Sequence, residues 1–143
     1  MLYQLKSTMF IIENTTNRYL NYNQVLKSHF GERIQKISIN AGFTCPNRDG
    51  SKGIGGCTYC NNQTFSPEYC TPTKSITQQI DEGVQFFRKY ESQMYLAYFQ
   101  SYTNTYDALD KLTAIYEEAL AHPKVAGIVV GTRPDCVNDE LLD

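Results

Sequence analysis

The chain has 143 residues, of which 41% are hydrophobic, and a formal net charge of -2. Seven Phe and eleven Tyr can supply the core of one domain, so we expect a folded chain. The near-neutral charge excludes a strongly basic nucleic-acid-binding protein, and no run approaches the roughly 20 apolar residues of a membrane-spanning helix. We therefore expect a cytoplasmic protein with no membrane association, in which five cysteines indicate metal binding instead of disulfides.

The first part of the chain predicts an N-terminal helical arm over residues 1–32. Apolar residues at Leu20, Val25, Leu26 and Phe30, followed by Gly31, predict a short helix over 20–30 that ends at the glycine.

The remainder, residues 33–143, alternates strand and helix patterns. Strands are predicted over 34–40, 95–100 and 126–131, the last apolar and β-branched like a buried parallel strand. Ser75 and Gln78 form a capping box before a helix over 76–90. A second helix spans Leu109 to Leu120 and stops before His122-Pro123, and a third begins at 138–142. This β-α-β-α-β-α order predicts an α/β fold with parallel strands.

The loops that follow the three strands should therefore share one edge of the sheet. They comprise the segment after residue 40, residues 100–105 and residues 132–135. Ligands of α/β proteins bind at the carboxyl ends of parallel strands. We expect the functional site at this edge.

Three cysteines dominate the first of these loops: Cys45, Cys57 and Cys60. The Cys57-x-x-Cys60 pair alone suits zinc, iron-sulfur and redox sites. Four glycines between Cys45 and Cys57 allow the backbone to approach a bulky inorganic group and to point amides at it. Three thiolates can hold a 4Fe-4S cluster by three irons and leave the fourth open. A zinc site completed by His29 or His122 is the alternative, although both lie on predicted helix ends far from the loop.

The sequence around the three cysteines resembles that of radical S-adenosylmethionine enzymes. The resemblance lies in NAGFTCPNRDG (residues 40–50), Gly55-Gly56-Cys57-Thr58-Tyr59-Cys60, YLAYFQSYTNT (95–105) and GTRPDC (131–136). Eleven residues separate Cys45 from Cys57, whereas three are usual in that superfamily. This long spacer is similar to that of a bacterial subfamily of Fe-S oxidoreductase type, related to the Elongator catalytic subunit.

The resemblance implies a fold and an activity. The fold would be the N-terminal half of an open (β/α)6 partial TIM-like barrel, truncated within residues 33–143. Cys45, Cys57 and Cys60 would ligate the 4Fe-4S cluster, and S-adenosyl-L-methionine would chelate the open iron. Its reductive cleavage would give a 5'-deoxyadenosyl radical. A flavodoxin- or ferredoxin-type donor would supply the electron, and a tRNA base is the expected substrate by analogy with the Elongator relatives.

Further residues are assigned to the cofactor on the same basis. Tyr59 would shield the cluster and pack near adenine, or else be a core aromatic. Gln100, Ser101 and Thr103 stand where many relatives carry Gly-Gly-Glu for the methionine amino group. Arg133 would pair with a carboxylate and Asp135 with a ribose hydroxyl, the alternative being a turn that ends in a helix cap.

Other interpretations stay open. The chain could be a non-catalytic zinc or iron-sulfur module, or a radical enzyme that acts on a small molecule or protein. The 143 residues alone are expected to be inactive and to self-associate through the open edge of the third strand. Arg48 and Asp49 are expected to form a loop-stabilising pair, and Cys70 and Cys136 to be buried apolar residues.

Overall fold

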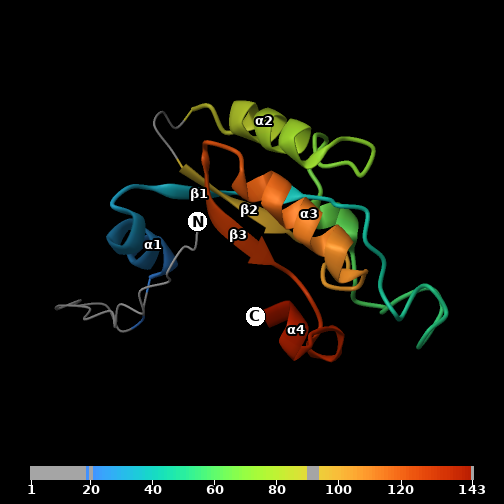
Figure 1. Ribbon diagram of the computed structural model, residues 1–143. Coiled ribbons are helices and arrows are strands. Elements are labelled where there is room, and N and C mark those ends of the chain that lie inside the picture. Colours follow the sequence, from blue (N-terminus) through green and yellow to red (C-terminus); the bar gives the residue numbers. More distant parts are fainter. Residues whose placement is uncertain (1–18, 20, 90–93, 143) are drawn as a thin grey trace.

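The computed structural model describes residue 19 and the ranges 21–89 and 94–142 (Figure 1). Most of the predicted arm over 1–32, together with Leu20, Tyr90 and Asp143, lies outside the described residues. The elements in chain order are α1 (Tyr22–Phe30), β1 (Ile34–Ile39), the 3-10 turn η1 (Asn62–Phe65), α2 (Ile76–Phe86), β2 (Met94–Phe99), α3 (Leu109–Leu120), β3 (Val125–Val130), the 3-10 turn η2 (Pro134–Cys136) and α4 (Asp139–Leu142).

The three strands form one parallel sheet in the order β1-β2-β3. Ile37 lies opposite Ala97, and Ala97 lies opposite Ile128. The predicted α/β class and the parallel pairing are confirmed. Because the strands are parallel, the segments that follow them leave the sheet at one edge, as the sequence indicated.

Helices α2 and α3 pack together on one face of this sheet (Figure 1). The core between them and the strands contains Ile37, Ile80 and Phe99, each with no exposed surface. The Phe99 ring also meets Tyr116 of α3 edge-on, with ring centroids 5.0 Å apart. This layer fixes the strands, and hence the positions from which the functional loops start.

The helix ends follow the local sequence signals. The Ser75 hydroxyl accepts a hydrogen bond from the Gln78 backbone N-H, and the Gln78 side chain accepts one from the Ser75 N-H, so the capping box at the start of α2 is confirmed. Gly31 ends α1 with φ 77°, and its N-H donates to the Lys27 carbonyl at 2.9 Å. Helix α2 ends at Phe86 instead of residue 90, because Phe87 leaves the helical conformation at φ -94° and ψ 13°.

The third strand differs from its prediction. It spans Val125–Val130, one residue earlier than expected, and all six residues are half-buried instead of buried. β3 lies at one edge of the sheet beside β2, and α3 packs against it. The register also shifts at Tyr95/Leu96, so that Val125 and Gly127 pair with consecutive residues of β2.

No helix within the described part of the chain combines the length and the apolar character needed to cross a membrane.

Candidate functional site

The loops after the three strands are joined by backbone bonds at the carboxyl edge of the sheet. The Thr103 N-H donates to the Thr44 carbonyl at 3.2 Å, which ties the loop after β2 to the cysteine loop. The Asn104 N-H donates to the Gly131 carbonyl at 3.1 Å, and the Gly131 N-H donates to Phe99 at 2.7 Å. These bonds hold the three loops beside one another.

Between its first two cysteines the loop folds back on itself. The Lys52 and Gly53 N-H groups both donate to the Pro46 carbonyl, at 2.8 and 3.2 Å, and the Gly56 N-H donates to the Asn47 carbonyl at 2.9 Å. Gly56 has φ 88°, a region that favours glycine. These contacts bring Cys57 back toward Cys45 across the eleven-residue spacer.

Cys45, Cys57 and Cys60 line one cavity of about 290 Å³. The same cavity is lined by four of the residues assigned to the cofactor, namely Tyr59, Gln100, Thr103 and Arg133. The folded chain therefore brings together residues that are separated by up to 88 positions. The other assigned residues, Ser101 and Asp135, lie beside this set without lining the cavity.

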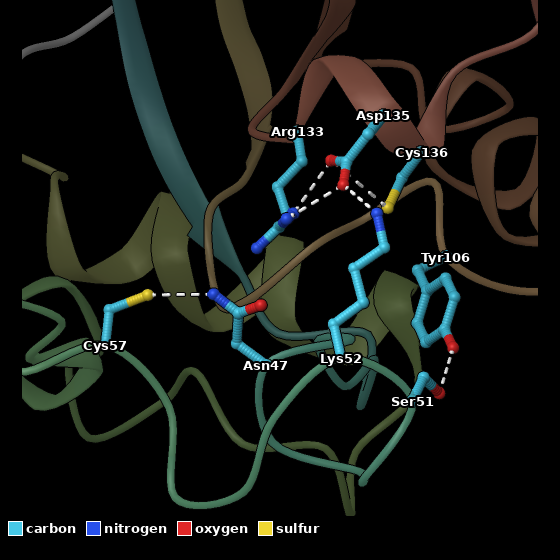
Figure 2. A network of polar contacts seen from close by, with 8 residues as sticks. All are labelled: Asn47, Ser51, Lys52, Cys57, Tyr106, Arg133, Asp135 and Cys136. Atoms are coloured by element: carbon cyan, nitrogen blue, oxygen red, sulfur yellow. Dashed lines mark hydrogen bonds and ion pairs between the residues drawn. The ribbon is translucent and has the colours of Figure 1, made fainter.

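Two of the three thiols are held in surroundings that favour the thiolate. Burial raises the pKa of Cys45, but hydrogen bonds from the Thr103 side chain, the Asn47 backbone and Arg133 outweigh it, so the net pKa is lowered. The pKa of Cys57 is lowered chiefly by the Asn47 amide, whose Nδ2 donates to Sγ at 3.1 Å (Figure 2). Thiolates are the form that binds metal.

The third cysteine is more open. Cys60 is exposed, and its Sγ donates to Asn62 Oδ1 at 3.6 Å. The Asn62 Nδ2 atom is buried and has no partner within the described residues, although Asn62 lines the cavity. An unpaired buried N-H donor beside three cysteines suits a bound group that accepts hydrogen bonds, such as sulfide or a carboxylate.

Arg133 and Asp135 bind each other. Arg133 donates from Nε to Oδ1 at 2.9 Å and from Nη2 to Oδ2 at 2.8 Å, and Lys52 of the cysteine loop also contacts Asp135 (Figure 2). The two cations hold the pKa of Asp135 well below its usual range. The expected contacts of Arg133 with a carboxylate and of Asp135 with a ribose stay predictions. The Pro134–Cys136 segment is a turn, as the alternative proposed, but Asn138 rather than Asp135 caps α4, through the Leu141 N-H.

The residues after β2 differ in accessibility. Gln100 is half-buried, whereas Ser101 and Thr103 are buried. The Ser101 hydroxyl lies 3.4 Å from the Ser66 hydroxyl. Gln100 and Thr103 line the cavity and Ser101 does not, so Gln100 and Thr103 are the candidates for contact with a cofactor.

Three sequence interpretations are corrected by side-chain environments. Tyr59 is 88% exposed, so it is not a core aromatic. Cys70 is buried as expected, but Cys136 is only half-buried, because it lies at the surface edge of the sheet. Arg48 and Asp49 do not pair: Arg48 lies over the Tyr102 ring at 5.2 Å, and Asp49 accepts from the Ser51 N-H at 2.9 Å.

Sequence patterns did not single out Asn47, Lys52, Tyr102 or Asn104. Tyr102 has φ 64°, a strained value for a bulky residue, beside the cavity that it lines. Asn104 is fully buried and donates from Nδ2 to the Phe99 and Gly131 carbonyls at 3.1 and 2.7 Å. Their position could have indicated them, since all four lie in loops that follow predicted strands.

The three cysteines do not form a site for a single metal ion. Within the described residues, no three His, Cys, Asp or Glu side chains lie close enough to hold one metal ion. Tetrahedral zinc, with Zn–S bonds of about 2.3 Å, needs sulfurs within about 4 Å of one another, whereas a cluster distributes its ligands over several irons. His122 pairs with Asp81 at 3.2 Å, and His29 lies on α1 before β1. Both positions precede strands and so lie away from the cysteine edge.

Comparison with known proteins gives relatives among longer chains. The sequence is 40% identical over 118 residues to protein YhcC of Escherichia coli (strain K12), covering 82% of this chain and 37% of the relative. It is 37% identical over 140 residues to the uncharacterized protein YtqA of Bacillus subtilis (97% and 44%), and 32% identical over 127 residues to the uncharacterized protein MJ0486 of Methanocaldococcus jannaschii (87% and 38%). No family model and no solved structure matches. The chain spans less than half the length of these relatives, and none of their names states an activity.

Proposed function

We propose that the protein is a radical S-adenosylmethionine enzyme whose 4Fe-4S cluster is held by Cys45, Cys57 and Cys60. The observation that carries this proposal is the single cavity lined by all three cysteines, two of which have lowered pKa values. Three cysteine ligands leave one iron of such a cluster open.

When bound, the cluster and S-adenosylmethionine supply a reductive cleavage of the sulfonium that yields methionine and a 5'-deoxyadenosyl radical for hydrogen abstraction. The chain's own residues would bind and orient these groups. Asn47 donates to the Cys57 sulfur, and the Asn62 Nδ2 provides an unused donor. Arg133 offers a guanidinium to a carboxylate, and Thr103 and Gln100 offer polar contacts from the loop after β2. Tyr59 is accessible to cover an adenine.

The proposal concerns the whole protein, because the relatives are more than twice as long as these 143 residues. The parallel sheet covered on one face by α2 and α3 is compatible with part of an open (β/α)6 barrel. We further propose a cytoplasmic enzyme that takes its electron from a flavodoxin- or ferredoxin-type donor and modifies a tRNA base. An isolated sheet of three strands would pair with a second copy through the outer edge of β3.

The cluster assignment is tested by electron paramagnetic resonance. Protein reconstituted with iron and sulfide without oxygen, then reduced, should give a cluster signal that changes when S-adenosylmethionine is added. Cys45→Ala should abolish the signal, whereas Cys70→Ala, which removes a buried thiol that does not line the cavity, should preserve it. A zinc-loaded protein, or a cluster indifferent to S-adenosylmethionine, would instead indicate a non-catalytic metal module.

The substrate assignment needs a separate test. Nucleosides of tRNA from cells that lack the gene should show a missing or incomplete modification by mass spectrometry, and re-expression of the full-length protein should restore it. Re-expression of the Cys45→Ala variant should not. Unchanged nucleosides would transfer the proposal to a small-molecule or protein substrate.

A further inference from the structure

Asp135 lies between two cations that come from distant parts of the chain. Its carboxylate binds Arg133, two residues away, and Lys52 of the cysteine loop, 83 residues away (Figure 2). Side-chain exposure is 37% for Asp135 and 29% for Arg133. Exposed ion pairs contribute little to stability, so stability alone does not explain why two cations bind Asp135.

The Arg133–Asp135 contact fixes an orientation. Two parallel bonds at 2.9 and 2.8 Å hold the planar guanidinium along its Nε–Nη2 side. Arg133 also lines the cavity together with Cys45, whose pKa it lowers as a donor and as a positive charge. Asp135 itself does not line the cavity. A carboxylate outside the cavity therefore sets the direction of a positive group inside it.

The Lys52–Asp135 contact connects the cysteine loop to the same point. The neighbouring Ser51 hydroxyl lies 2.9 Å from the Tyr106 hydroxyl of the loop after β2 (Figure 2). The cysteine loop is thus attached at adjacent residues to both other loops of this edge. These attachments lie midway between Cys45 and Cys57 in sequence, where a loop of eleven residues would otherwise be least constrained.

We propose that Asp135 is a positioning residue for the cysteine site: it aims the Arg133 guanidinium at Cys45 and, through Lys52, holds the cysteine loop against the end of β3. What the cavity contains rests on the proposed function. A fixed positive group beside a cluster bound by three thiolates favours its more negative, reduced state. Arg133 held in this way raises the reduction potential of the cluster, and Asp135 acts through Arg133.

The test compares Asp135→Asn, Arg133→Gln and the corresponding double variant, with two readouts. The first is the midpoint potential of the reconstituted cluster. Each single variant should lower it, Asp135→Asn by less because the loss of its own negative charge acts in the opposite direction. The double variant should lower it no further than Arg133→Gln alone, because Asp135 acts through Arg133. The midpoint potential of Arg133→Lys should stay below that of the unaltered protein, since lysine cannot form the two-bond contact with Asp135. Lys52→Met, which leaves the Arg133–Asp135 contact in place, should change it less.

The second readout needs no cluster. Amide hydrogen exchange of Lys52 and Gly53, which donate to Pro46, should be faster in metal-free Asp135→Asn and Lys52→Met. Glu82→Gln, which breaks the remote Lys74–Glu82 pair at 2.7 Å, is the matched control and should leave exchange unchanged.

The outcomes separate this inference from the proposed function. Failure of the unaltered protein to take up a cluster would refute the proposed function, whereas the exchange readout would still decide the loop attachment. Additive shifts in potential, or an unchanged potential in Asp135→Asn, would overturn the positioning role. Exchange in Asp135→Asn equal to that in Glu82→Gln would also overturn it.

Discussion

Replacing Gly56 by alanine tests how closely the backbone of the cysteine loop is specified. Gly56 has φ 88°, where a side chain costs about 1–2 kcal/mol. A Cβ there would also lie 2.7 Å from Arg48 Nε, so Arg48 would have to leave the Tyr102 ring that it covers at 5.2 Å. Loss of that contact costs about 0.5–1 kcal/mol. The closed loop should therefore be destabilised by about 1.5–3 kcal/mol.

The chain supplies matched controls within the same loop. Gly55 has φ 85° but nothing within 4 Å of an added Cβ, so Gly55→Ala should cost only the backbone part, about 1–2 kcal/mol. Gly53 needs no positive φ, and its added Cβ would make ordinary contacts, the nearest at 3.5 Å from the Asn47 carbonyl oxygen. Gly53→Ala should therefore be neutral or slightly stabilising.

Amide hydrogen exchange at position 56 measures the effect, because this N-H donates to the Asn47 carbonyl at 2.9 Å. We expect exchange to accelerate roughly 10- to 150-fold in Gly56→Ala and roughly 5- to 30-fold in Gly55→Ala. Arg48→Ala should add little in the Gly56→Ala background, where its contact with Tyr102 is already lost, but should accelerate exchange further in the Gly55→Ala background. Equal rates for Gly55→Ala and Gly56→Ala, or an equal effect of Arg48→Ala in both backgrounds, would refute the contact that we infer.

Three further predictions concern the scaffold around the site. Gly83→Ala would place a Cβ 2.4 Å from Ile37 Cγ2; overpacking of about 1–3 kcal/mol should outweigh a helix-propensity gain of about 1 kcal/mol, and a rise in the urea midpoint would contradict this. Asn104→Leu removes the two Nδ2 bonds to the Phe99 and Gly131 carbonyls, each of which keeps a backbone donor, and should lower the free energy of unfolding by about 1–3 kcal/mol; an unchanged free energy of unfolding would contradict this. Burial raises the pKa of Cys70 from 9.0 to about 11. The protonated Cys70 thiol contributes fully to stability below pH 9, and this contribution is lost as the pH rises through 11. The melting temperature should therefore fall over this range, and it should fall less in Cys70→Ala.

Local patterns were sufficient for the order of elements. The capping box at Ser75 and the glycine after Phe30 act within one helical turn, so their consequences are present in the sequence itself. The parallel arrangement followed from the alternation of strands and helices, because crossover connections have one hand. Because the strands are parallel, the sequence also predicted which edge of the sheet carries the cysteine loop.

Boundaries and burial depended on neighbours that no local pattern specifies. The β-branched composition of β3 suits a buried strand, yet each of its residues is half-buried, whereas Ile37 and Ile39 of β1, the other edge strand, are fully buried. Cys136 is likewise half-buried despite its apolar character. Burial is a property of what packs against a residue, and packing partners come from elsewhere in the chain.

The sequence by itself determined which residues are available at the functional edge: three cysteines with a glycine-rich spacer, and polar residues after the next two strands. Only the tertiary structure decided how they interact. It paired Asp135 with Arg133 and Lys52 instead of leaving it open, placed Arg48 over Tyr102 instead of beside Asp49, and gave Asn47 to the Cys57 sulfur. The physical reason is that spacing along a loop limits reach but not direction, whereas hydrogen bonds and ion pairs depend on direction, which is set only when separate strands bring their loops to one edge.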